Sequence, residues 1–272
     1  LPLAIEFAYA GFKTLGFDIN DDKIAKINNG DNYIEDIDIE LFKSMVTQKK
    51  FLGTSDFSSI KEVDFIAICV PTPLNEHQSP ELDYIKTSAV QIAKNMKKES
   101  IIVLESTTYP GTTENILKPI LEKESKLICN SDFYLGFSPE RVDPGNKTYN
   151  TKNTPKVVGA IETISAVYEA VLDNEVYKVS SPAVAEMEKI LENTFRNVNI
   201  GLVNELAMLC HKMGISIWEV IEAASTKPYG FMPFYPGPGL GGHCIPLDPY
   251  YLSWRAKEFK FHTSMIETSM VI

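Results

Sequence analysis

Residues 1–30 read LPLAIEFAYAGFKTLGFDINDDKIAKINNG, and this stretch sets the fold class. The first twelve residues space their apolar side chains as a helix does, and Gly11 ends that helix. KTLGFDIN (13–20) then predicts a strand that ends at Asp18, and DDKIAKINNG (21–30) predicts a helix with Gly30 at its C-terminal end. Alternation of helix and strand is typical of an α/β protein.

The alternation continues along the first two-thirds of the chain. VDFIAICVPTP (63–73) predicts a buried strand that is cut off by Pro71 and Pro73. Further elements are expected as a helix at 82–97 and as strands at 100–111, 133–138 and 156–160. Continuous apolar runs between amphipathic helices indicate a parallel sheet that is covered on both faces.

The pattern changes after residue 180. Residues 183–213 predict one long helix, 216–225 a second, and more helix is expected from about residue 249. A loop rich in glycine and proline separates the last two. We therefore expect an α/β domain over 1–180 and an all-helical domain over 181–272.

Composition argues against several classes of protein. Hydrophobic residues make up 44% of the 272, which is enough for a core, and the net charge of −10 argues against nucleic-acid partners. The four cysteines form no CxxC pair, so we expect no metal site, no disulfide framework and a reduced, cytoplasmic setting. No stretch approaches the ~20 apolar residues of a membrane span. Glu6 is acidic at a place where a signal peptide is basic or apolar, so we expect no secretion signal in this stretch.

Asp18 is a candidate cofactor residue. At the end of the second strand of a βαβ unit, an acid accepts hydrogen bonds from the adenosine ribose and repels a 2′-phosphate. Asp21 and Asp22 add to that repulsion, so NAD is favoured over NADP. An ordinary strand-end acid explains Asp18 equally well.

The glycine-rich motif of dinucleotide-binding folds belongs about 20 residues before this acid. That position falls at or just before Leu1. We therefore expect a Rossmann-like sheet that lacks its first strand and glycine loop.

Small polar residues follow two of the predicted strands. Thr72 lies in CVPTP (69–73), and Thr107 and Thr108 lie in ESTTYPG (105–111). Ligands bind outside the carboxyl ends of strands in open α/β sheets. These hydroxyls are candidates for contact with a cofactor or a catalytic water, and turn capping is the alternative.

The long helix carries two rows of side chains. An apolar stripe consists of Val184, Met187, Leu191, Val198 and Leu202, and a polar row consists of Glu186, Lys189, Asn193, Asn197 and Asn204. Lys189 and Asn193 point in the same direction because they are four residues apart. A solvated face is the common explanation of a polar row. Three amides are unusual on such a face, and they suit a place that needs hydrogen bonds without charge.

The loop PGPGLGGHCIPLDPYY (236–251) surrounds one cysteine with glycine and proline. Its four glycines let backbone N–H groups approach an anion closely, and its prolines stiffen it. Cys244 is then a thiol in fixed geometry, with Asp248 four residues later. His243 does not pair with it, because adjacent side chains rarely converge. A structural cysteine in a turn is the alternative.

The chain resembles the UDP-glucose/GDP-mannose dehydrogenase family. PGPGLGGHCIPLDPYYL (236–252), preceded by KPYGFMPFY (227–235), is similar to its active-site loop, and is most similar to that of bacterial UDP-N-acetylglucosamine 6-dehydrogenases of surface-polysaccharide synthesis. GFDIN, CVPTP, ESTTYPGTT, GFSPERVDPG and EKILENTFRNVNIGLVNELA occur in the family's order. The family's opening glycine motif and its C-terminal domain do not occur, so the resemblance implies a fragment.

The resemblance implies an NAD-dependent, four-electron oxidation of the C6 hydroxyl of a UDP-N-acetylhexosamine, with UDP-GlcNAc favoured, through a thiohemiacetal and a thioester on the nucleophile Cys244. It also implies a homodimer built on the long helix. The alternatives are the same chemistry on UDP-ManNAc or UDP-glucose, or a non-catalytic fragment that binds UDP-sugar or dimerises. Leu247 argues against glucose, since glucose enzymes usually carry lysine there.

Residue roles follow from the same resemblance. Lys189 matches the lysine that stabilises an oxyanion and lowers the pKa of the thiol. Asn193 and Asp248 match residues that position substrate and a catalytic water, Thr107 the hydroxyl beside that water, and Glu140 the general acid/base. The implied NAD contacts are Asp18, Lys23, Val70, Thr72 and Thr107. The implied substrate contacts are Glu140, Arg141, Val142, Lys189, Asn193, Tyr235, Gly237, Gly239 and Gly241.

Overall fold

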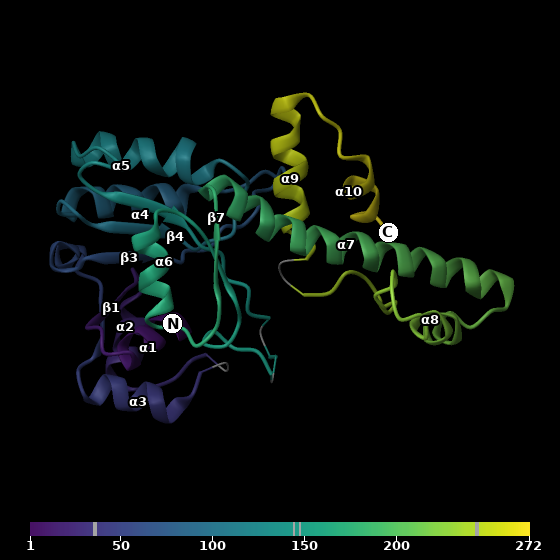
Figure 1. Ribbon diagram of the computed structural model, residues 1–272, viewed down its shortest axis with the longest axis horizontal. Helices are drawn as coiled ribbons and strands as arrows, with labels where there is room; N and C mark the ends of the chain where they lie inside the picture. Colours follow the sequence, from purple (N-terminus) through teal and green to yellow (C-terminus); the bar gives the residue numbers. More distant parts are fainter. Residues whose placement is uncertain (35–36, 144, 147, 243–244) are drawn as a thin grey trace. The chain divides into compact units, whose positions relative to one another are not determined.

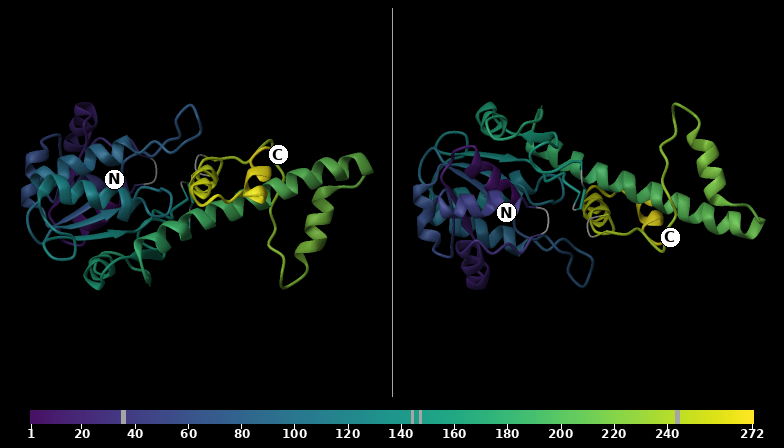
Figure 2. Two further views of the ribbon diagram at one scale, coloured as in Figure 1. Left: turned by 90° about the horizontal axis from the view of Figure 1, so that it is seen from above. Right: turned by 90° about the horizontal axis from the view of Figure 1, so that it is seen from below.

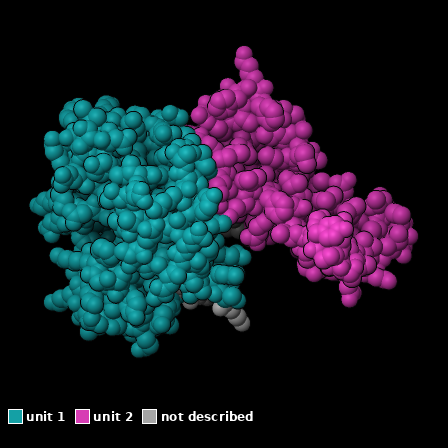
Figure 3. Space-filling model, in the orientation of Figure 1, with its two compact units in different colours: residues 1–70, 83–106, 111–185 teal, residues 71–82, 107–110, 186–272 magenta. Residues whose placement is uncertain are grey.

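The computed structural model describes residues 1–34, 37–143, 145–146, 148–242 and 245–272 (Figure 1). The chain forms two compact units (Figure 3). Unit 1 comprises residues 1–70, 83–106 and 111–185, and unit 2 comprises residues 71–82, 107–110 and 186–272. The units interleave along the chain, so the boundary near residue 180 stays a prediction.

Unit 1 is the α/β part of the chain. Its helices are α1 (Pro2–Tyr9), α2 (Asp21–Asn29), α3 (Ile39–Thr47), α4 (Asp83–Asn95), α5 (Lys118–Ser125) and α6 (Glu162–Glu169). Its strands are β1 (Thr14–Phe17), β2 (Phe51–Thr54), β3 (Phe65–Ile68), β4 (Ile101–Leu104), β5 (Tyr134–Phe137), β6 (Lys156–Gly159) and β7 (Val176–Val179). A 3-10 helix (Phe57–Glu62) precedes β3, and a π-helical turn (Thr113–Leu117) precedes α5.

The strands form two sheets. β1 pairs with β2 in parallel, and the second sheet has the order β3-β4-β5-β6-β7. β3, β4 and β5 are parallel, and β6 is parallel to β7, but β5 and β6 pair antiparallel at Phe137 and Gly159. The parallel sheet expected from the sequence is therefore confirmed, with the exception of this one pair. The described part of the connection between β5 and β6 contains no crossover helix, and a parallel pair needs one.

Helix α1 packs into two apolar cores of unit 1. Leu3 and Phe7 belong to one core, and Ile5 and Ala8 to the other. The first core also contains Val103, Val158, Ile164, Tyr168, Val171, Leu172 and Val176, and the second also contains Ile27, Phe42, Met45 and Phe51. Each large side chain that is fully buried contributes ~2 kcal/mol. The residues around Phe7 thus hold the start of the chain against the larger sheet.

Unit 2 is built on a single long helix. α7 (Pro182–Met213) runs without a break, although its first four residues belong to unit 1 (Figure 2). α8 (Ile217–Ser225), α9 (Asp248–Ala256), a 3-10 turn (Lys257–Phe259) and α10 (Ser264–Ser269) follow. α10 approaches α7 at Gly201, where an added Cβ would lie 3.2 Å from Ser269. Within the described ranges, no helix combines the length and the apolar character that crossing a membrane requires.

On α7 the polar row is buried and the apolar stripe is exposed, which is the reverse of an ordinary surface helix. Glu186, Lys189, Asn193, Asn197 and Asn204 are all less than 9% exposed. In the apolar stripe, by contrast, Val184, Met187, Leu191 and Leu202 are 40–59% exposed. The explanation of the polar row as a solvated face is therefore wrong. The amides face the interior, where they form hydrogen bonds.

Candidate active site

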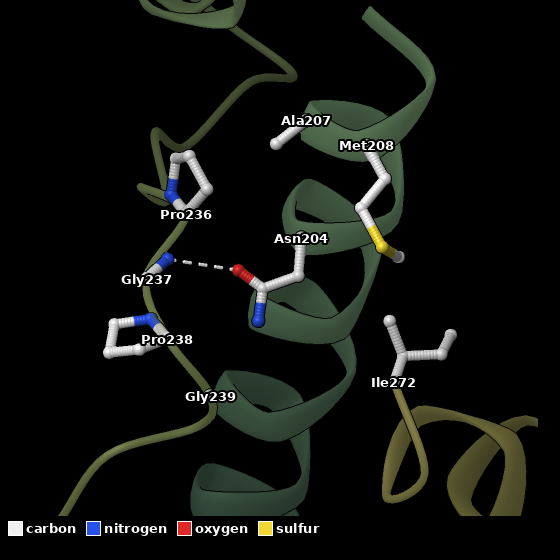
Figure 4. A pocket seen from close by; sticks show the side chains of 8 residues that line it. All are labelled: Asn204, Ala207, Met208, Pro236, Gly237, Pro238, Gly239 and Ile272. Atoms are coloured by element: carbon white, nitrogen blue, oxygen red, sulfur yellow. Dashed lines mark hydrogen bonds between the residues drawn. The ribbon is translucent and has the colours of Figure 1, made fainter. Parts of the chain in front are cut away.

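The amides of α7 hold the loop that contains Cys244. Asn204 accepts a hydrogen bond of 3.0 Å from the backbone N–H of Gly237 (Figure 4), and Asn197 donates one of 3.3 Å to the carbonyl of Ile245. Asn193 donates one of 2.5 Å to Oδ2 of Asp248. The row thus fixes the loop on both sides of residues 243–244. Cys244 itself lies outside the described residues, so its predicted role stays a prediction.

Lys189 is the one cation in the buried row, one turn before Asn193. It is 8% exposed, and it forms no ion pair or hydrogen bond with any residue that the structure describes. Burying an ammonium group without a partner is costly. Such a cation is well suited to stabilise a negative charge that develops on a bound molecule.

A pocket of about 310 Å³ lies between α7 and the glycine loop (Figure 4). Its lining comprises Asn204, Ala207, Met208, Ile272 and residues 236–239. The pocket therefore contains the predicted substrate contacts Gly237 and Gly239. Gly241 has a φ of 69°, a conformation that favours glycine. Tyr235 is 59% exposed and stacks on Trp218 of α8, with ring centroids 6.3 Å apart.

Thr72 and Thr107 also belong to unit 2, although they follow β3 and β4 in the chain. The Thr72 hydroxyl donates a hydrogen bond of 2.7 Å to the Thr107 carbonyl, so it joins the two loops. Its oxygen still has lone pairs with which to accept a bond. Val70, in unit 1, accepts a bond of 2.7 Å at its carbonyl from Ser106, a contact that the sequence did not suggest.

Asp18 and Lys23 form the other predicted cofactor group, in unit 1. Asp18 directly follows β1, and its Oδ2 lies 3.2 Å from Nζ of Lys23. Its Oδ1 accepts a bond of 2.9 Å from the N–H of Asn20, which caps α2. Both side chains of the ion pair are partly exposed, and exposed pairs contribute little. The carboxylate retains acceptor capacity toward solvent, and its predicted contact with the adenosine ribose stays a prediction.

The Glu140–Arg141–Val142 segment is held by its own hydrogen bonds. Oε1 of Glu140 accepts bonds from the N–H groups of Arg141 (2.8 Å) and Val142 (2.9 Å). Nη1 of Arg141 donates a bond of 2.9 Å to the carbonyl of Pro155. The structure thus keeps the predicted substrate contacts of unit 1 in one fixed turn.

A buried ionic cluster, which sequence reasoning missed, lies beneath this turn. Nζ of Lys156 is 2.6 Å from Oε2 of Glu105 and donates a bond of 3.2 Å to the carbonyl of Pro139. The Tyr168 hydroxyl donates to Oε1 of Glu105. Burial raises the pKa of the Glu105 carboxyl. The sequence signal was a charged residue that directly follows the apolar run IIVL (101–104).

No group of three or more His, Cys, Asp or Glu side chains in the described ranges has an arrangement that could hold a metal ion.

Known proteins are similar to the whole of this chain. Residues 1–181 match the NAD binding domain of the UDP-glucose/GDP-mannose dehydrogenase family, and residues 183–272 match that family's central domain. The chain is 41% identical to Protein CapL of Staphylococcus aureus over 98% of its own length and 62% of that protein. It is 39% identical to a UDP-N-acetyl-D-glucosamine 6-dehydrogenase of Pseudomonas aeruginosa, over 98% of its own length and 63% of that protein.

A solved structure supports the same relationship. The UDP-D-ManNAc dehydrogenase of Pyrococcus horikoshii superposes with a TM-score of 0.91 at 34% identity, covering 99% of this chain and 64% of that one. The chain thus spans a little over three-fifths of the length of these relatives.

Proposed function

The chain belongs to the UDP-glucose/GDP-mannose dehydrogenase family, and from that premise we propose that it is the cofactor-binding and catalytic part of an enzyme that oxidises the C6 hydroxyl of a UDP-N-acetylhexosamine to the carboxylate. Two equivalents of NAD accept the two hydrides, and water supplies the second oxygen. The observation that carries the proposal is Lys189, which is buried and has no partner among the described residues, one helical turn from the Asn193 that holds Asp248.

Cys244 supports the second oxidation in this proposal. Loss of the first hydride and the hydroxyl proton converts the alcohol to an aldehyde. The Cys244 thiolate then adds to the aldehyde carbon, and the thiohemiacetal loses the second hydride and a proton to become a thioester. Water attacks the thioester, which releases the carboxylate and returns the thiol.

The other predicted residues act around that thiol. Lys189 stabilises the negative oxygen of each tetrahedral species, and Asp248, held by Asn193, positions the attacking water together with Thr107. Glu140 serves as the general acid/base. Arg141 and the glycine loop bind the nucleotide sugar. Asp18 and Lys23 hold the adenosine ribose of NAD, and Val70 and Thr72 complete the cofactor contacts.

UDP-GlcNAc is the proposed substrate, with UDP-ManNAc as the second candidate. The chain is 39% and 38% identical to two UDP-N-acetyl-D-glucosamine 6-dehydrogenases, against 36% for a UDP-N-acetyl-D-mannosamine dehydrogenase. A rate comparison with UDP-GlcNAc, UDP-ManNAc, UDP-GalNAc and UDP-glucose tests this order. A higher kcat/KM with UDP-ManNAc would reverse it.

The stoichiometry of NADH tests the four-electron reaction. This chain in its full-length protein, supplied with UDP-GlcNAc and NAD, is expected to form two NADH per sugar, and a single NADH contradicts the proposal. Cys244→Ser is expected to bind UDP-GlcNAc normally and to fail to release the acid. Cys210→Ser, which alters a free thiol on α7, is the matched control and keeps full activity.

We also propose that the apolar stripe of α7 is covered by a second copy of the chain. Leu191 and Leu202 of α7 and Trp218 of α8 are large apolar side chains that are 51–59% exposed, and a monomer rarely leaves many such side chains open together. Leu202→Asp is expected to give a monomer in light scattering, whereas Lys212→Glu at the exposed end of α7 leaves the dimer intact. A cytoplasmic setting and a domain boundary near residue 180 remain part of the proposal.

A further inference from the structure

Tyr251 connects helix α9 to the two loops that carry Thr72 and Thr107. It lies one turn after Asp248 on α9, and both side chains are buried, at 0% and 2% exposed. The Tyr251 hydroxyl donates a hydrogen bond to the carbonyl of Thr72. The Thr72 hydroxyl in turn donates to the carbonyl of Thr107 over 2.7 Å. Two consecutive hydrogen bonds thus lead from α9 to both loops.

A second contact joins the same helix to the same loops. The ring of Tyr109 lies 5.0 Å from that of Trp254, measured between centroids, and the guanidinium of Arg255 lies 5.6 Å from the Tyr109 ring. Residues 107–110 therefore pack against the second and third turns of α9. These contacts agree with the division of the chain, in which residues 71–82 and 107–110 belong to the helical unit.

The other end of α9 is fixed to α7. Asp248, its first residue, accepts the 2.5 Å hydrogen bond from Asn193. One short helix therefore carries Asp248 at its start and holds the Thr72 and Thr107 loops one and two turns later. The separation between Asp248 and Thr107 therefore depends on α9, on the Tyr251 hydroxyl and on the contacts of Tyr109 with the same helix.

We propose that Tyr251 is a positioning residue for catalysis, which holds the Thr72 and Thr107 loops in register with Asp248. This inference rests on the proposed function, in which Thr107 and Asp248 act on one water. Groups that act together need placement to within a fraction of an ångström, and small displacements cost large factors in rate. Tyr251 does not touch substrate in this proposal. It acts through the carbonyl of Thr72.

Hydrogen exchange of the ligand-free protein provides the first test. Tyr251→Phe keeps the ring and removes only the hydroxyl, so residues 71–82 and 107–110 are expected to exchange about fivefold faster, the factor for loss of one neutral hydrogen bond. Tyr250→Phe makes the same chemical change one residue away, at a partly exposed position, and is expected to change nothing. Equal exchange in wild type and Tyr251→Phe overturns the inference.

Kinetics provide the second test. Tyr251→Phe is expected to lower kcat about tenfold and to leave the KM for UDP-GlcNAc within twofold, while Tyr250→Phe keeps both. Because Thr72→Val breaks the next bond of the same relay, the double variant Tyr251→Phe/Thr72→Val should be no slower than the slower single variant, and additive losses contradict the relay. Absence of turnover in the wild-type protein counts against the proposed function alone, and the exchange result then decides the inference.

Discussion

Asn193 and Asp248, 55 positions apart in the chain, are joined by a 2.5 Å hydrogen bond between two buried side chains. The amide satisfies a carboxylate oxygen without adding a charge, and Lys189 lies one helical turn away on the same face of α7. A cation at position 193 would add a second positive charge close to Lys189 and would repel it. The neutral donor avoids this repulsion.

Removing this donor is expected to cost stability. Asn193→Ala takes away the amide that a buried carboxylate accepts from, so the free energy of unfolding should fall by about 2 kcal/mol. Urea unfolding at neutral pH measures the change. Asn199→Ala is the control on the same helix, because its amide donates to the Phe195 carbonyl one turn earlier, and it should cost less than about 0.5 kcal/mol. Equal losses for the two variants would falsify the assigned role of the pair.

Replacing Lys189 is expected to make the protein more stable and less active. Lys189→Met replaces a buried ammonium, which has no partner in the part of the chain that the structure describes, with an apolar chain of similar length, so the free energy of unfolding should rise by about 1 kcal/mol. Turnover should fall at least a hundredfold, since the oxyanion loses its cation. Lys212→Met, at the exposed end of α7, should change neither quantity. A Lys189→Met protein that is less stable yet active contradicts the assignment.

Sequence periodicity predicted much of the frame. The helices α1, α2, α4 and α8 and the strands β1, β3, β4, β5 and β6 lie within the expected ranges, and α7 and α9 each begin one residue earlier than expected. α3, β2, α5, α6 and β7 were not predicted; the three of these that are helices are only eight or nine residues long, and the two strands have four residues each. Predicted elements such as α2, with nine residues, and β1, with four, are equally short, so length alone does not explain the difference. The contacts that short elements make in the fold also decide their structure.

The buried site required tertiary information. Periodicity on α7 separated an amide row from an apolar stripe, but it does not specify which row is covered. The partners of the row, such as Asp248 for Asn193, come from a loop about 50 residues away. The Lys156–Glu105 pair, 51 positions apart, and Tyr251 with Thr72, 179 positions apart, carry no local signal for the same reason.

The Lys156–Glu105 pair should be far more sensitive to substitution than a surface pair. Its side chains are 7% and 3% exposed, and Lys156→Met leaves a buried carboxylate without its cation, which should cost about 3 kcal/mol. Lys178 pairs with Glu162 and Glu169 on the surface, with 42% of its side chain exposed, and Lys178→Met should cost far less, because solvent screens an exposed pair. Thermal unfolding compares them, and similar shifts in Tm for both variants count against a structural role for the buried pair.

The pH dependence of stability offers a test at Glu6 of α1. Burial raises the pKa of its carboxyl, an effect that Lys152 partly offsets, and Oε2 has no hydrogen-bond partner among the described residues. A raised pKa means that the folded state binds the proton more tightly than the unfolded chain does. The stability that Glu6 contributes is therefore complete below the pKa of the unfolded carboxyl, and it is lost as pH rises through the folded pKa.

Glu6→Gln removes this titration. Wild type and variant should be equally stable near pH 4, and the variant should become more stable by about 0.5 kcal/mol at pH 7, a value discounted for the partial exposure of the carboxylate. Asp132→Asn is the control of opposite sign, because the hydrogen bond from Lys98 lowers the pKa of Asp132. Its loss of stability should be present at pH 7 and should shrink as the pH falls. Urea midpoints measured from pH 4 to pH 7 distinguish the two, and an advantage of Glu6→Gln that is largest at pH 4 rules out the sign derived for Glu6.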